Sequence, residues 1–216
     1  MVIIEDLKLV IKNKTILDNI NMKLEEGQIY GFVGNNGCGK TMLMKCICGF
    51  VKPTVGKIVA DGKKIRKDCD YLENAGVIIE NPGFIPYYSG YRNLKILSEI
   101  KGIIDKNKIR ETMKNCGLDP YLKLSVKKYS LGMRQRLGLA QALMEEPKNL
   151  ILDEPMNGLD KNGVNDMREL LLRLKTQERL IILASHNPAD IEILCDVVYE
   201  MDNGKIVAEH KMSKIS

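Results

Sequence analysis

The stretch Gly34-Asn35-Asn36-Gly37-Cys38-Gly39-Lys40-Thr41 decides the fold of this 216-residue chain. It matches the pattern G-x-x-x-x-G-K-[ST], whose glycines let the backbone curl until successive N–H groups point inward at phosphate oxygens. Residues 28–33 before it are predicted to form a buried strand, and residues 40–49 after it a helix. This order predicts a phosphate-binding loop to which the helix adds its positive end.

The loop predicts a nucleotide site, with ATP and Mg²⁺ as the expected ligands. Lys40 is expected to reach the terminal phosphates, and the Thr41 hydroxyl to ligate Mg²⁺. Cys38 is either a compact side chain of the turn or a thiol close to the nucleotide. The other residues expected to contact the nucleotide here are Asn35, Asn36, Gly37, Gly39 and Met42.

A second chemical element follows the apolar run at residues 149–152, which ends in Asp153 and Glu154. A buried strand that ends in acids delivers carboxylates to the sheet edge where open α/β folds bind their ligands. Asp153 suits the Mg²⁺ site because a hard cation prefers oxygen. Glu154 is then available to orient or deprotonate the attacking water. Acids at strand ends are common, so a structural role is the alternative when this pair is taken alone.

His186 follows a third apolar run, residues 180–184, and lies thirty-two residues after Glu154. A neutral imidazole at this edge could donate to the γ-phosphate and sense its presence, which makes His186 a catalytic candidate. The alternative is an incidental polar residue at a strand end.

The rest of the chain alternates strands and helices, which predicts an α/β phosphate-loop NTPase with a mostly parallel central sheet. Residues 2–10 and 16–24 are predicted to be strands joined by a polar turn, which predicts an antiparallel β part at the N-terminus. A block of helical periodicity interrupts the strands, with helices expected at 91–101, at 106–116 and from Ser130. We expect one domain, 1–216, divided into a nucleotide-binding core (1–84 and 147–216) and a helical subdomain (85–146).

Composition limits the class of protein without naming a function. Hydrophobic residues make up 44% and charged residues 28%, as in ordinary globular proteins. The longest uncharged run, residues 27–39, has thirteen positions, whereas a membrane-crossing helix needs about twenty. The six cysteines form no C-x-x-C pair, and the first residues do not resemble a secretory signal, so we expect reduced thiols and a cytoplasmic location. The net charge of +5 is compatible with several kinds of partner.

The segment Tyr129-Ser130-Leu131-Gly132-Met133-Arg134-Gln135-Arg136 adds a more specific likeness. It resembles the signature of ATP-binding-cassette (ABC) transporters, LSGGQ, with Ser130 and Gly132 at matching positions. The longer run YSLGMRQRLGLAQAL is similar to the variant in bacterial drug, bacitracin and lantibiotic exporter ATPases. The run from Glu154 to Asp160 resembles the D-loop of the same group. The chain thus resembles the ATP-binding subunit of a bacterial ABC transporter.

This resemblance implies an ATPase that works as a pair. Two copies, or one copy and a homologous subunit, would associate head-to-tail, so that Ser130 and Gly132 of one contact the ATP held by the other. Asp160 would lie close to the same nucleotide. ATP hydrolysis by the pair would drive a separate permease of about six membrane spans. The transport expected is export of a drug, peptide or similar small molecule. The chain would then lie on the inner face of the cell membrane, without a nucleic-acid partner.

Two positions depart from the family pattern. Ile11 stands where an adenine-stacking aromatic is usual, and without the aromatic we expect GTP to compete better than in relatives that have it. Glu80 stands where the family has the glutamine of its Q-loop; it is either a further Mg²⁺ ligand or a solvated acid at a strand end. The resemblance also implies that residues 82–86 receive a coupling helix of the permease, unless Phe84 and Ile85 pack against the helical subdomain.

Two other classes remain open as alternatives. One is a soluble ABC ATPase that acts on nucleic acid or ribosomes. Only eighty-eight residues without sustained heptads separate Thr41 from Ser130, which leaves no room for the long coiled coil of chromosome-type members. The other is a phosphate-loop kinase, which would require neither the Ser130 segment nor His186.

Overall fold

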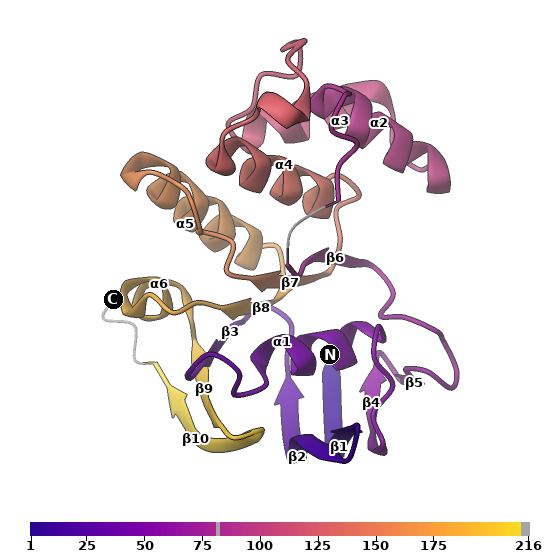
Figure 1. Ribbon diagram of the computed structural model, residues 1–216, viewed down its shortest axis with the longest axis vertical. Coiled ribbons are helices and arrows are strands. Elements are labelled where there is room, and N and C mark those ends of the chain that lie inside the picture. The colour runs from indigo at the N-terminus through magenta and orange to yellow at the C-terminus, as the bar shows by residue number, and fades with distance from the viewer. Residues whose placement is uncertain (81–82, 213–216) are drawn as a thin grey trace.

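The computed structural model describes residues 1–80 and 83–212, which form two sheets and a group of helices (Figure 1). A four-stranded antiparallel sheet has the order β2-β1-β4-β5, and a six-stranded sheet has the order β10-β9-β3-β8-β7-β6. The strands of the first sheet are β1 (Val2–Ile11), β2 (Lys14–Leu24), β4 (Val55–Ala60) and β5 (Lys63–Lys64). Those of the second are β3 (Ile29–Val33), β6 (Ala75–Ile78), β7 (Asn149–Asp153), β8 (Leu180–Ala184), β9 (Val197–Asp202) and β10 (Lys205–Lys211).

The six-stranded sheet is parallel except for β10, which pairs antiparallel with β9. Its central strands alternate between two apolar cores, as a period of two requires. On β7, Leu150 and Leu152 face the core shared with the helical block, whereas Ile151 faces the core shared with the antiparallel sheet. Because the strands are parallel, the residues after Val33, Asp153 and Ala184 all emerge at one edge.

Helix α1 (Lys40–Cys48) lies between the two sheets and contributes Leu43, Met44 and Ile47 to their common core. Helices α2 (Gly90–Lys101), α3 (Lys106–Asn115) and α4 (Leu131–Leu143), with the short 3-10 turn η1 (Val126–Lys128), form a separate group beyond β6 (Figure 1). Helices α5 (Lys161–Lys175) and α6 (Pro188–Leu194) follow β7 and β8. No helix among the described residues combines the length and apolarity needed to cross a bilayer.

The predicted architecture is confirmed: an α/β fold with a mostly parallel sheet, an antiparallel N-terminal part and an inserted helical block. The sequence patterns did not predict the α-helix α6, which has only seven residues and too few turns to show periodicity. In the stretch 82–86, Pro82 lies outside the described residues. Phe84 packs against the helical core, while Ile85 is 41% exposed.

Candidate nucleotide-binding site

The phosphate loop has the backbone that its glycines were expected to permit. Gly34 has φ +140°, and a Cβ there would lie 2.2 Å from the carbonyl oxygen of Met201, so no side chain fits. The turn between β9 and β10 contacts the loop, because the Gly204 N–H donates to the Cys38 carbonyl at 2.9 Å. This hydrogen bond and the close approach of Met201 therefore fix the backbone of the loop.

Helix α1 begins directly at the end of this loop and lacks a side-chain cap. Its N-cap is Gly39, whose φ is +112°, and no acid lies in its first turn. In the described part of the chain, every other α-helix has a side chain that accepts a hydrogen bond from its first turn: Ser89, Asp105, Ser130, Asp160 and Asn187. The N–H groups at the start of α1 are thus left for an anion, which the helix dipole also favours.

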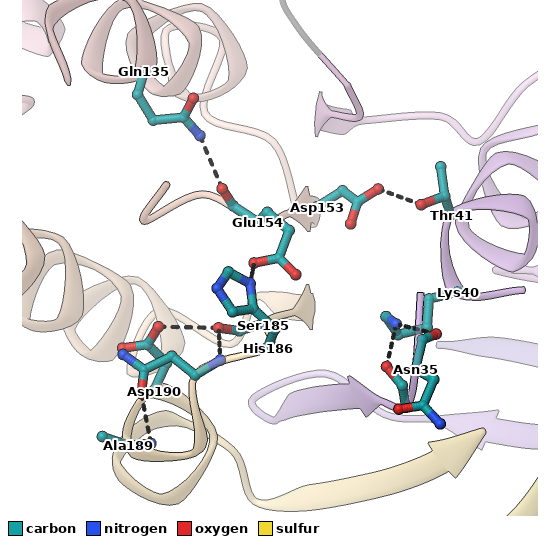
Figure 2. Close-up of polar contacts among 12 residues, drawn as sticks. Asn35, Lys40, Thr41, Gln135, Asp153, Glu154, Ser185, His186, Ala189 and Asp190 are labelled. Atoms are coloured by element: carbon teal, nitrogen blue, oxygen red, sulfur yellow. Dashed lines mark hydrogen bonds and ion pairs between the residues drawn. The ribbon is translucent and has the colours of Figure 1, made fainter. Parts of the chain in front are cut away.

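Lys40 is folded over the loop and is only 9% exposed. Its ammonium donates to the carbonyls of Gly34 at 2.6 Å and Asn35 at 3.2 Å, as Figure 2 shows. Its third N–H faces the Cys38 Sγ at 3.7 Å, a weak acceptor that a phosphate oxygen can replace. The loop itself therefore holds the charge of Lys40 where the phosphates are expected.

The Thr41 hydroxyl and the Asp153 carboxylate meet across the sheet edge, with 2.6 Å between Oγ1 and Oδ2. A hydroxyl and a carboxylate are hard oxygen donors of the kind that Mg²⁺ prefers. No cluster of three or more His, Cys, Asp or Glu ligands occurs among the described residues. Two protein oxygens therefore fit an ion that is completed by nucleotide phosphates and water, which is the usual Mg²⁺ arrangement, rather than a cage made by protein alone.

Glu154 and His186 form a pair on the other side of the same edge, with 2.8 Å between Oε2 and Nδ1. The carboxyl of Glu154 is 25% exposed and the imidazole 69%. A carboxylate accepts hydrogen bonds, so Nδ1 is the donor in this pair when Glu154 is ionised. Donation by His186 to the γ-phosphate stays a prediction.

A cavity of about 590 Å³ lies between the phosphate loop and the end of β7. Nine residues that the sequence assigned to the site line it: Asn36, Gly37, Gly39, Lys40, Thr41, Met42, Glu80, Asp153 and Glu154. Asn35 and His186 line an adjoining cavity of about 780 Å³. Cys38 is buried behind the loop, where its Sγ lies 3.7 Å from the Lys40 ammonium. Most of the predicted residues therefore converge on one place.

Four further predicted residues line neither cavity: Ile11, Ser130, Gly132 and Asp160. Ile11 ends β1 and is 39% exposed. Ser130 caps α4, where its Oγ accepts from the Met133 N–H at 3.1 Å, and Asp160 caps α5. Gly132 lies close to the turn before α5, since a Cβ on it would be 3.1 Å from the Gly158 carbonyl oxygen.

Glu80 forms an ion pair with α1. Its Oε1 lies 2.5 Å from the Lys45 ammonium, and its side chain is 66% exposed. The carboxylate borders the same cavity as Thr41 and Asp153, so the role of Mg²⁺ ligand stays a prediction. The ion pair places a cation of α1 beside this acid at the border of the cavity.

Three cavity residues were not assigned to the site from the sequence: Ile16, Gln135 and Asn157. Gln135 lies on α4, and its Nε2 donates to the Glu154 backbone carbonyl at 3.3 Å, so α4 contacts the site through Gln135. No sequence signal marks it, because its position depends on how α4 packs against β6, the neighbour of β7. Asn157 follows Glu154 in the run that resembles a D-loop, and this proximity was the signal available.

The fold and the site together define a phosphate-loop nucleotide-binding protein of the α/β class. Residues 17–157 match the family described as "ABC transporter". The chain belongs to the ABC transporter family, as one of its ATPase cassettes.

Individual relatives agree with this assignment. An uncharacterized ABC transporter ATP-binding protein of Bacillus subtilis, YybJ, is 43% identical over 94% of this chain and 93% of its own length. A lantibiotic transport ATP-binding protein of Streptococcus pyogenes, SrtF, is 38% identical over 97% of this chain and 90% of its own length. The fold matches that of the cassette MJ0796, solved as a post-hydrolysis dimer bound to ADP and Pi, with a TM-score of 0.89, 20% identity and full coverage of both chains.

Proposed function

We propose that this chain binds Mg-ATP in the 590 Å³ cavity and hydrolyses it as the motor subunit of an exporter. One observation carries the proposal: Lys40, the Thr41–Asp153 pair and the Glu154–His186 pair converge on one sheet edge, beside the uncapped start of α1. This set supplies positive charge, a metal position and a base. The chemistry of phosphoryl transfer requires little else from a protein.

The residues divide the reaction between them. Lys40 and the first N–H groups of α1 neutralise and orient the phosphates. A Mg²⁺ ion, held by Thr41 and Asp153, would supply further neutralisation of phosphate charge. Glu154 accepts the proton of the water that attacks the γ-phosphorus, and the bond to the leaving ADP oxygen breaks. His186, bonded to Glu154 at 2.8 Å, fixes the direction of that carboxylate.

The site is completed by a second copy or a homologous subunit. Ser130 and Gly132 do not line the cavity of their own chain, although the start of α4 has the N–H groups and hydroxyl of an anion site. In a head-to-tail pair, these residues would close over the γ-phosphate held by the partner, and Asp160 would lie at the contact. The cassette MJ0796, a protein of the same fold, was solved as a dimer, which supports a paired arrangement.

Closing and opening of the pair would drive a permease in the membrane, for which we propose about six spans. The core (1–84 and 147–216) would hold ATP, and the helical subdomain (85–146) would carry the signature. The likeness to SrtF, a lantibiotic transport protein, supports export of a peptide or similar small molecule. The chain would then be peripheral on the inner face of the cell membrane.

The test is the substitution Glu154→Gln, which keeps the shape of the side chain and removes the base. We expect ATPase turnover to fall about 10²- to 10⁴-fold while ATP is still bound, with dimer accumulating in size-exclusion chromatography. Asp166→Asn is a matched control, because Asp166 is an exposed acid that pairs with Arg136 outside the cavity. Wild-type turnover in the Glu154→Gln variant would refute the role of Glu154.

A further inference from the structure

A polar network surrounds the backbone of His186 without contacting its ring (Figure 2). Asp190 on α6 is 1% exposed and uses both carboxylate oxygens. Oδ1 accepts from Arg168 on α5, at 2.9 Å from Nε and 2.5 Å from Nη2. Oδ2 accepts from the Ser185 hydroxyl at 3.0 Å. A buried carboxylate with every partner satisfied holds those partners in one arrangement.

Ser185 continues this network across His186. Its hydroxyl donates to Asp190 and accepts from the N–H of Asn187 at 3.2 Å. Asn187 in turn caps α6, because its Oδ1 accepts from the Ala189 N–H at 3.1 Å. The residues on either side of His186 are thus hydrogen-bonded to each other, and the turn they form is fixed to α5 through the Arg168–Asp190 ion pair.

The imidazole itself has little else to hold it. It is 69% exposed, and within residues 1–80 and 83–212 its hydrogen-bonding partner is Glu154. A ring without packing around it takes its direction from the backbone that carries it. We propose that Arg168 and Asp190 are positioning residues, which act through Ser185 to aim His186 at Glu154 and the γ-phosphate. This inference rests on the function proposed above for His186 and Glu154.

The same ion pair links two parts of the site. Helix α5 begins at the Asp160 cap, directly after the turn that contains Asn157, and Arg168 is eight residues further along. A displacement of α5 would therefore be passed to the His186 turn through Asp190. Arg168 suits this task because its planar fork approaches one oxygen with two N–H groups.

The experiment is a double-mutant cycle with steady-state ATPase kinetics on the full chain. Asp190→Asn and Ser185→Ala each weaken the network. Ser185→Ala keeps the Arg168–Asp190 ion pair, so it serves as the test variant if Asp190→Asn folds poorly. We expect kcat to fall about ten- to hundredfold with KM changed less than twofold. In a His186→Gln background, the same changes should lower kcat no further. Independent, multiplying effects of Asp190→Asn and His186→Gln would overturn the proposal.

The matched control is Lys175→Met. Lys175 also lies on α5, and its 2.5 Å ion pair with Asp196 is partly buried, with side chains 24% and 20% exposed. Loss of this pair should leave kcat unchanged, because it joins α5 to the residue before β9 and not to Asp190. An equal loss of kcat in Lys175→Met would show that the effect is one of general stability and would overturn the inference.

A spectroscopic measurement gives a second readout without turnover. The chain has only two histidines, His186 and His210, so histidine-labelled protein shows two imidazoles by NMR. Asp190→Asn and Ser185→Ala should shift the signal of His186 and leave that of His210 in place. An unshifted His186 signal would overturn the inference. If instead His186→Gln itself retains wild-type turnover, the proposed role of His186 fails.

Discussion

The Thr41 hydroxyl donates a 2.6 Å hydrogen bond to the Asp153 carboxylate, although 112 positions separate the two residues in the chain. Thr41 is in the first turn of α1 and Asp153 is the last residue of β7, so the contact joins the phosphate loop to the far side of the sheet edge. Two oxygens so close, beside a phosphate loop, are placed to share a divalent cation.

Thr41→Val should therefore weaken the use of Mg²⁺. The substitution keeps the β-branched shape and removes one oxygen donor, so we expect the Mg²⁺ concentration for half-maximal ATPase to rise about tenfold or more. Thr41→Ser, which keeps the hydroxyl, is the control and should stay near wild type. Superimposable Mg²⁺ titrations of the Val and Ser variants would contradict the assignment of Thr41.

The Lys45–Glu80 pair predicts a charge effect that can be reversed. Lys45→Met leaves the Glu80 carboxylate, which borders the cavity, without its 2.5 Å partner. Repulsion of the phosphates should then weaken ATP binding, most strongly when Mg²⁺ is absent. Adding Glu80→Gln to this variant should restore binding. Isothermal titration with and without Mg²⁺ measures both effects, and a double variant as weak as Lys45→Met would contradict the explanation.

Two isoleucines compete for the role of adenine contact. Ile11 aligns with the aromatic position of the family, whereas Ile16 lines the cavity. We predict that Ile11→Tyr restores an aromatic contact of about 1 kcal/mol, which is about a fivefold gain in ATP affinity, with a smaller gain for GTP. Ile16→Tyr is the comparison. A gain in ATP affinity in the Ile16→Tyr variant alone would contradict the role of Ile11 and indicate that Ile16 contacts the base.

The thiols should differ widely in reactivity. Burial raises the pKa of Cys46, Cys48 and Cys116 to about 12. At pH 8 only about one in ten thousand of these thiols is then the reactive thiolate, and the fraction rises tenfold with each pH unit. Maleimide labelling of native protein followed by mass spectrometry should modify Cys69, which is only partly buried, before these three. This difference in labelling rate between the cysteines should disappear in denaturant, because burial causes it.

Cys38 tests the hypothesis of a thiol beside the nucleotide. Its Sγ lies 3.7 Å from the Lys40 ammonium, and the side chain is 5% exposed. Bound ATP should slow its labelling further, because the phosphates cover the loop. A Cys38 labelling rate that is the same with and without ATP would exclude that hypothesis.

The sequence was most informative where local chemistry decides the structure. Gly34 has no space for a side chain, and Ser130 caps the helix that was expected to begin there. The Asp153–Glu154 and His186 positions followed from strands whose ends lie at a common edge. These features depend on neighbours along the chain or on the parallel pairing of buried strands.

Contacts that depend on packing between distant elements could not be predicted in this way. Gln135 reaches Glu154 because α4 packs against β6, beside the end of β7, and Lys45 neutralises Glu80 because α1 passes the end of β6. The hydrogen bond between Nδ1 of His186 and Glu154 likewise has no sign in the sequence.

The position of Ser130, outside the cavity of its own chain, has a consequence for genetics. In the proposed pair, a Ser130 substitution damages the ATP site of the partner, while a Lys40 substitution damages the site of the chain that carries it. A cell that makes equal amounts of normal and Ser130-altered chains would assemble only about a quarter of its pairs from two normal copies. Each pair of one normal and one Ser130-altered chain would keep one of its two sites. A pair of one Ser130-altered and one Lys40-altered chain would also keep one site, so these two alleles, each inactive alone, would partly complement each other.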